Sequence, residues 1–216
     1  YKVDGFRFDL MGHHMVANME AVEGALSSLT PQQDGVDGPD ILLYGEGWDF
    51  GEVAGNARGV NATQRNLAGT GIGTFNDRLR DAARGGTPFS GPQEQGFITG
   101  LFTDPNGAAQ GTDDEVRARL LHAADQIRVG LAGNLADYTF ENAEGRTVRG
   151  SEVDYNGSPA GYTQSPRENV VYVAAHDNET LFDAVQLKAP EALPTAERVR
   201  MNNLGLSLVA LSQGRP

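Results

Sequence analysis

The sequence contains no cysteine, which excludes disulfide bonds and thiolate zinc sites. It also has no apolar run of the roughly 18 residues that a membrane-spanning helix needs. Basic residues are scarce, because 17 Lys and Arg stand against 29 Asp and Glu, giving a formal net charge of −12. This excess of negative charge argues against nucleic acid and anionic membrane surfaces as partners, and it is compatible with an uncharged binding partner.

Several recurrent signatures are missing as well. The sequence shows no internal repeat and no low-complexity tract, and no glycine-rich loop joins a strand to a helix in the order that phosphate binding requires. It has no Asp/Asn-rich loop with EF-hand spacing. A chain of 216 residues can bury one sizeable core, and nothing in the composition divides it into two domains.

What the sequence does contain is three short apolar segments that each end at a carboxylate, namely Asp9, Glu46 and Asp177. A single Asp at the end of a strand is more often the cap of the following helix. Three such endings favour a shared site, because the carboxyl ends of parallel strands in a β/α barrel open on one face, where catalytic groups gather.

The first segment, residues 3–9, shows how such a carboxylate is prepared for chemistry. Strand alternation places Arg7 and Asp9 on the same face. A guanidinium two residues away favours the ionised form of Asp9 and fixes its direction. An ionised, oriented carboxylate is suited to act as a nucleophile.

The sequences around the three carboxylates are specific enough to indicate a family. The motifs are GFRFD at residues 5–9, YGEGW at residues 44–48 and HDN at residues 176–178. They resemble the strand-four, strand-five and strand-seven motifs of the α-amylase superfamily of glycoside hydrolases. The neighbouring residues, DLMGHH at 9–14 and GEGWDFGE at 45–52, are similar to those of type I pullulanases, which debranch α-glucans.

This resemblance implies an α/β fold, a partial (β/α)8 barrel that runs from strand four to the helix after strand seven. Residues 1–216 are then expected to form part of one catalytic barrel domain, with strands one to three and strand eight onward outside this sequence. Barrels of this type usually need about 250 residues.

The resemblance also assigns roles to the three carboxylates. Asp9 is expected to be the nucleophile and Glu46 the general acid and base, since retaining glycosidases place two such carboxyl groups about 5 to 5.5 Å apart. Asp177 is expected to bind sugar hydroxyls and to help distort the ring. If HDN stood alone, a helix cap would be the simpler interpretation of Asp177.

Five further residues are expected to bind substrate: Arg7, His13, Trp48, His176 and Asn178. Trp48 lies two residues after Glu46, where it is suited either to stack on a sugar or to pack in the core. The pair His13-His14 could instead bind zinc, but no further zinc ligands occur at the spacing that such a site requires. We therefore expect no metal at these residues.

The function implied by the resemblance is retaining hydrolysis of α-1,6 links in pullulan, starch or glycogen-type α-glucans. An α-1,4-acting amylase-like hydrolase is the alternative, and a non-catalytic glucan-binding barrel is another. No cofactor is required; calcium is common in the superfamily, although no ligand motif for it is seen. The compartment stays open between a secreted bacterial enzyme, which we favour, and a cytoplasmic one.

Apolar periodicity and capping signals outside the motifs predict the remaining elements. A capping box at Thr112 and Glu115 marks the clearest helix start. Turn-rich composition predicts long loops over residues 49–111, which we expect to overhang the strand ends, and a second turn-rich segment over residues 134–168. The predicted helices cover residues 15–29, 76–83, 112–131 and 194–213, and further strands cover 71–75 and 170–175.

Overall fold

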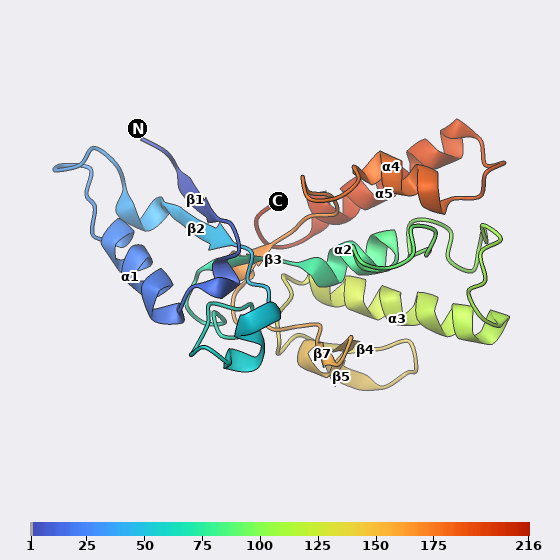
Figure 1. Ribbon diagram of the computed structural model, residues 1–216, viewed down its shortest axis with the longest axis horizontal. Coiled ribbons are helices and arrows are strands. Elements are labelled where there is room, and N and C mark those ends of the chain that lie inside the picture. Colours follow the sequence, from blue (N-terminus) through green and yellow to red (C-terminus); the bar gives the residue numbers. More distant parts are fainter. Residues whose placement is uncertain (1) are drawn as a thin grey trace.

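A four-stranded parallel sheet forms the centre of the molecule. The computed structural model describes residues 2–216, so Tyr1 lies outside the described residues. The strands follow one another across the sheet in the order β1-β2-β3-β8, each parallel to its neighbour (Figure 1). They are β1 (Gly5–Phe8), β2 (Leu42–Gly45), β3 (Gly73–Phe75) and β8 (Asn169–Val170).

Helices follow the strands along the chain, which confirms the α/β class. Strand β1, helix α1 and strand β2 form the expected parallel βαβ unit, and α1 lies beside β1 and β2 at one end of the molecule (Figure 1). The other α-helices gather at the opposite end. The five are α1 (Val16–Ser27), α2 (Asp77–Arg84), α3 (Asp113–Leu131), α4 (Leu181–Lys188) and α5 (Thr195–Leu211).

Two helices begin where the sequence predicts. The hydroxyl of Thr112 accepts a hydrogen bond from the backbone N–H of Glu115, and the Glu115 carboxylate accepts one from the N–H of Thr112 at 2.8 Å, so the capping box is confirmed. Asn76 caps α2 by accepting from the N–H of Leu79 at 3.3 Å. Each cap satisfies backbone donors that the first turn leaves unpaired.

The strand expected over residues 170–175 is shorter than predicted. It ends at Val170. The N–H of Asn76 donates to the carbonyl of Val170 at 2.9 Å, and the neighbouring strand β3 then gives way to α2, so no partner strand remains on that side among the described residues. On its other side the chain pairs with Arg215, which accepts from the N–H of Val171 at 2.7 Å. Residues 171–177 therefore continue without strand pairing.

Short elements also interrupt the segments predicted as loops. Residues 134–168 contain two hairpins, formed by β4 (Thr139–Glu141) with β5 (Thr147–Arg149) and by β6 (Asp154–Tyr155) with β7 (Ser158–Pro159). The 3₁₀ turns are η1 (Met11–His13), η2 (Gly38–Asp40), η3 (Gly51–Asn56), η4 (Gly150–Glu152) and η5 (Pro166–Glu168).

Two main apolar clusters hold the elements in place. One joins α2, α3 and α5 to the segment after β8 and includes Leu79, Ile127, Val171 and Leu208. The other lies beneath β1, β2 and α1 and includes Met11, Met19, Leu43, Leu67 and Ile72.

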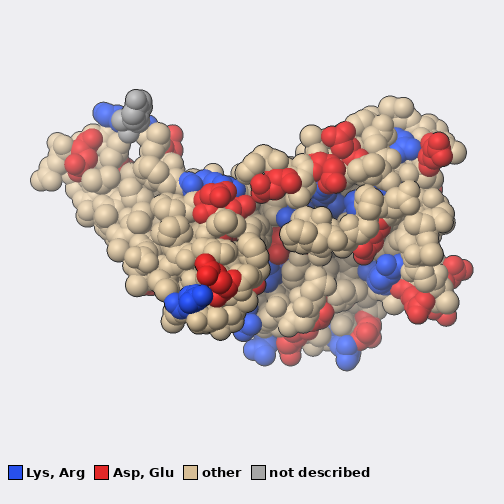
Figure 2. Space-filling model, viewed as in Figure 1, with Lys and Arg blue, Asp and Glu red and all other residues tan. Residues whose placement is uncertain are grey.

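The charged side chains on one face of the molecule are distributed over several elements. On the face shown in Figure 2, acidic side chains lie over several elements with basic ones between them. Within residues 2–216, no helix has both the length and the apolar character needed to cross a membrane.

Candidate active site

The register of β1 and β2 brings the first two motifs together. Phe8 is paired with Gly45, and the N–H of Glu46 donates to the carbonyl of Phe8 at 3.1 Å. Asp9 and Glu46 thus follow directly beyond the carboxyl ends of two adjacent parallel strands. This is the position that the sequence predicts for them.

A single guanidinium contacts both carboxylates. Nη1 of Arg7 lies 2.7 Å from Oδ1 of Asp9, and Nη2 of Arg7 lies 3.1 Å from Oε1 of Glu46. The exposed fraction of the side chain is 72% for Asp9 but 7% for Glu46. The carboxylate of Asp9 is therefore accessible to a ligand, while that of Glu46 is buried.

The second oxygen of Glu46 is also occupied. Oε2 accepts a hydrogen bond from the backbone N–H of Leu10 at 2.7 Å. Leu10 has a φ of 42°, in the left-handed region that a leucine rarely adopts, so the backbone turns sharply after Asp9 to deliver this donor. The N–H of Gly12 then donates to the backbone carbonyl of Glu46 at 2.8 Å. The loops after β1 and β2 are thereby tied to each other.

The charges around Asp9 and Arg7 support each other. The hydrogen bond from Arg7 is the main cause that lowers the pKa of Asp9, and the imidazole of His176, where protonated, acts in the same direction. Partial burial opposes the charge of Arg7, but the hydrogen bond to Asp9 and the negative charges of Glu46, Asp9 and Asp177 raise its pKa. Asp9 is consequently maintained as an anion.

The same electrostatic influences show that the third motif reaches this site. His176 acts on Asp9, and Asp177 acts on Arg7, although both follow an irregular segment far along the chain. Nε2 of His176 lies 3.2 Å from Oδ1 of Asp177, and both side chains are exposed. Asp9, Glu46 and Arg7 are thus in direct contact, and His176 and Asp177 lie near enough for their charges to act on this group.

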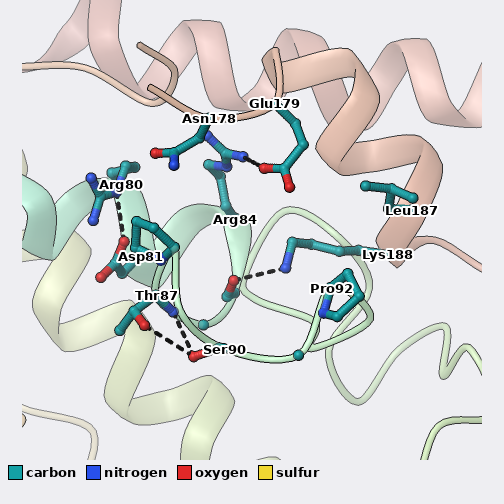
Figure 3. Close-up of a pocket in the computed structure, with 14 residues that line it drawn as sticks. Arg80, Asp81, Arg84, Thr87, Ser90, Pro92, Asn178, Glu179, Leu187 and Lys188 are labelled. Carbon is teal, nitrogen blue, oxygen red and sulfur yellow. Dashed lines mark hydrogen bonds and ion pairs between the residues drawn. The ribbon is translucent and has the colours of Figure 1, made fainter. Parts of the chain in front are cut away.

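Asn178 lies slightly apart from this group. Its Nδ2 donates to the carbonyl of Asp177 at 2.9 Å, and its side chain lines a neighbouring cavity together with Arg84 and Glu179 (Figure 3). Its role as a substrate-binding residue stays a prediction.

His13 and Trp48 stand on the loops that follow Asp9 and Glu46. The ring of His13 contacts Phe50 edge-on with centroids 5.2 Å apart, and its buried Nδ1 has no hydrogen-bond partner. Trp48 is half-buried, and its backbone packs against Gly12. Across residues 2–216, no group of three or more His, Asp or Glu side chains is arranged to hold a metal ion.

Phe75 is a contributor that the sequence alone does not single out. It ends β3, and the guanidinium of Arg7 lies over its ring at 5.7 Å from the centroid. The rings of Tyr44 and Tyr172 contact Phe75 edge-on at 5.9 and 5.2 Å. Phe75 therefore packs against Arg7, and the two tyrosine rings pack against Phe75. The available signal was that Phe75 ends a strand neighbouring the one that leads to Glu46.

No protein-family model matches the chain, but individual relatives do. Pullulanase 1, chloroplastic, of Arabidopsis thaliana is 54% identical over 100% of this chain and 22% of its own length. The pullulanase of Klebsiella pneumoniae is 47% identical over 99% of this chain and 19% of its own length. The chain thus spans about a fifth of the length of these curated relatives.

Solved structures agree with the sequence comparison. The maltotriose complex of PulA from Klebsiella pneumoniae superimposes with a TM-score of 0.88 at 45% identity, covering 99% of this chain and 22% of that one. Pullulanase from Bacillus acidopullulyticus gives a TM-score of 0.67 at 28% identity, covering 99% of this chain and 20% of that one. The resemblance indicated by the three motifs is therefore confirmed: over almost its whole length this chain is similar, in sequence and in fold, to a segment of known pullulanases.

Proposed function

We propose that this chain carries the catalytic face of a retaining glycoside hydrolase that debranches α-glucans at α-1,6 links. The observation that carries the proposal is the guanidinium of Arg7, which contacts Asp9 at 2.7 Å and Glu46 at 3.1 Å at the ends of two adjacent strands. Retention needs two neighbouring carboxyl groups with different tasks. Asp9 is exposed and Glu46 is buried, and this difference in surroundings supports different tasks for the two carboxyl groups.

In the proposed reaction, Asp9 attacks the anomeric carbon of the glucosyl unit and forms a covalent ester. Glu46 donates a proton to the departing glycosidic oxygen, so that the leaving chain departs as an alcohol. Glu46 then takes a proton from water, which hydrolyses the ester and restores Asp9. Asp177 accepts hydrogen bonds from sugar hydroxyls and favours the distorted ring of the transition state.

We infer that the sheet is an arc of a (β/α)8 barrel, with residues 1–216 forming part of one catalytic domain. Support comes from four parallel strands that are adjacent in the order in which they occur along the chain. The share of the relatives' length that this chain spans, 22% and 19%, leaves room for strands one to three and strand eight elsewhere in the protein. Among the described residues, β1 is an open edge of the sheet, whereas the outer edge of β8 already pairs with Arg215.

The choice of α-1,6 links rests on the relatives. Those 54% and 47% identical to this chain are named pullulanases, and the solved relative with a TM-score of 0.88 holds maltotriose. An α-1,4-acting hydrolase is expected to keep the same three carboxylates, so these residues do not separate the two activities. A non-catalytic glucan-binding barrel is disfavoured because Asp9, Glu46 and Asp177 are all present.

The test uses the natural polypeptide that contains this sequence, assayed in parallel on pullulan and on amylose. Release of maltotriose from pullulan, with little product from amylose, is expected for a debranching enzyme. Products from amylose alone would instead identify the α-1,4 alternative. The variant Asp9→Asn should abolish turnover while α-glucan binding persists, because it keeps the shape and removes the nucleophilic charge. No activity on either glucan would contradict the proposal.

A further inference from the structure

The segment that carries His176 and Asp177 is held by side chains rather than by a sheet. Strand pairing ends at Val170, and residues 171–177 are neither helix nor strand. Helix α2 contributes side-chain hydrogen bonds to this segment. Arg80 and Arg84 are spaced by four residues on that helix, so both project on one face, toward the segment.

The two arginines make two contacts with the segment and a third with Glu179, just beyond it. Nη1 of Arg80 donates to the hydroxyl of Tyr172 at 2.7 Å. Nη1 of Arg84 donates to the backbone carbonyl of Val173 at 3.3 Å, and its Nη2 donates to the carboxylate of Glu179 at 2.9 Å. The guanidinium of Arg84 therefore contacts one residue before and one residue after His176 and Asp177; Figure 3 shows its contact with Glu179.

Because Arg84 is buried, its charge depends on the carboxylate of Glu179 for compensation. Arg84 is 6% exposed, and burial lowers the pKa of Arg84 while Glu179 opposes that effect. A buried guanidinium that loses its carboxylate is strongly unfavourable. Arg80 differs, because it has its own partner in Asp81 at 2.7 Å. Glu179, in contrast, is about half-exposed, with 49% of its side chain accessible, so its main constraint is the contact with Arg84.

We propose that Arg84 is a positioning residue that places Asp177 for the reaction. Its planar fork binds one point on each side of Asp177, which fixes the path of the chain between them and hence the side from which Asp177 faces Asp9 and Arg7. A lysine cannot replace it, because an ammonium lacks the rigid fork that reaches two separate acceptors. This inference rests on the proposed function, since the position of Asp177 matters for the glucan that it binds.

The test compares Glu179→Ala, Glu179→Gln and Arg84→Lys in the natural polypeptide that contains this sequence. Glu179 is half-exposed, so its substitution creates no cavity in the core, but Glu179→Ala leaves the buried guanidinium of Arg84 without its carboxylate. Gln keeps an oxygen that can accept from Arg84 and should rescue most of the activity lost in the Ala variant. The matched control is Glu197→Ala, which removes the carboxylate of an exposed pair, 3.1 Å from Arg200 on α5, and should leave kcat/KM unchanged.

The decisive measurement is a double-mutant cycle with Asp177→Asn. A misplacement of about 1 Å costs on the order of 100-fold in rate, so Glu179→Ala should lower kcat/KM by up to that factor when Asp177 is present. With Asp177→Asn already in place, the further loss should be less than about threefold, because there is no carboxylate left to misplace. The same fold-loss in both backgrounds, or full activity of Glu179→Ala, would overturn the proposal.

A second readout does not depend on turnover. Hydrogen exchange of the amides of residues 174–178 should accelerate in Arg84→Lys and in Glu179→Ala, and stay unchanged in the Glu197→Ala control. Unchanged exchange in both variants would refute the positioning role. If the unsubstituted enzyme cleaves no α-glucan, the proposed function fails, and the exchange experiment still decides whether Arg84 fixes this segment.

Discussion

Replacing Gly12 by alanine should displace the two catalytic loops from each other. Gly12 follows Asp9 by three residues, and its N–H donates to the carbonyl of Glu46 at 2.8 Å. A Cβ at this position would lie 2.2 Å from the backbone oxygen of Trp48, and ordinary contact begins at 3.4 Å. The difference, 3.4 − 2.2 = 1.2 Å, must be taken up by backbone rather than by a flexible side chain.

The expected size of the effect follows from this displacement. A shift of about 1 Å between catalytic groups costs on the order of 100-fold in rate, or about 2.7 kcal/mol in activation free energy. Overpacking of this kind also costs about 1 to 3 kcal/mol of folding free energy. Gly12→Ala should therefore fold, with lowered stability and a kcat/KM reduced by about two orders of magnitude.

A matched glycine in the same region separates catalysis from folding. Gly24 lies within α1, and a Cβ built there meets nothing within 4 Å. Gly24→Ala should stabilise the protein by up to about 1 kcal/mol and leave kcat/KM unchanged. The assay is pullulan hydrolysis beside chemical unfolding of both variants. A Gly12→Ala enzyme within threefold of the unsubstituted kcat/KM would refute the claim that the close approach of these loops sets the site.

Three further predictions concern charge, capping and the isolated chain. In Arg7→Met, loss of the hydrogen bond that lowers the pKa of Asp9 should move the acid limb of the kcat/KM profile to higher pH, because the nucleophile must be ionised; an unmoved limb would contradict the role of Arg7. Thr112→Ala should cost about 1 kcal/mol in urea unfolding without changing kcat, and no loss would mean that the cap of α3 is dispensable. Residues 1–216 expressed alone should aggregate or form a molten species without hydrolase activity. The reason is that a sheet edge and apolar side chains such as Leu206 and Leu211, which are 52% and 77% exposed, stay uncovered. A monodisperse, cooperatively melting and active monomer would refute this.

The positions of Asp9 and Glu46 could be predicted because local signals and topology agree there. Each residue ends a short apolar run, and the helical periodicity between the runs predicts a parallel βαβ unit whose strand ends share one face. The contact between Arg7 and Asp9 follows from strand alternation and is confirmed at 2.7 Å. The additional contact of Arg7 with Glu46 could not be predicted, because it depends on the register between strands.

The segment after Val170 shows where sequence patterns fail. Its β-branched residues Val170, Val171 and Val173 favour a strand, but a strand also needs a partner with free backbone groups. That partner ends when β3 turns into α2 at Asn76, which no local pattern in the segment reveals. The contacts of Arg84 that replace the pairing join residues about ninety positions apart, so they are accessible only from the structure.

The role of Asp9 as the nucleophile of a retaining reaction can be examined by trapping its ester. In Glu46→Gln, a fluorinated glucosyl fluoride needs no protonation of its leaving group, so the first step should proceed while hydrolysis of the ester is slow. Digestion and mass spectrometry should then find one added glycosyl group, on the peptide that contains Asp9. A label on another residue, or no label while fluoride is still released, would contradict the account.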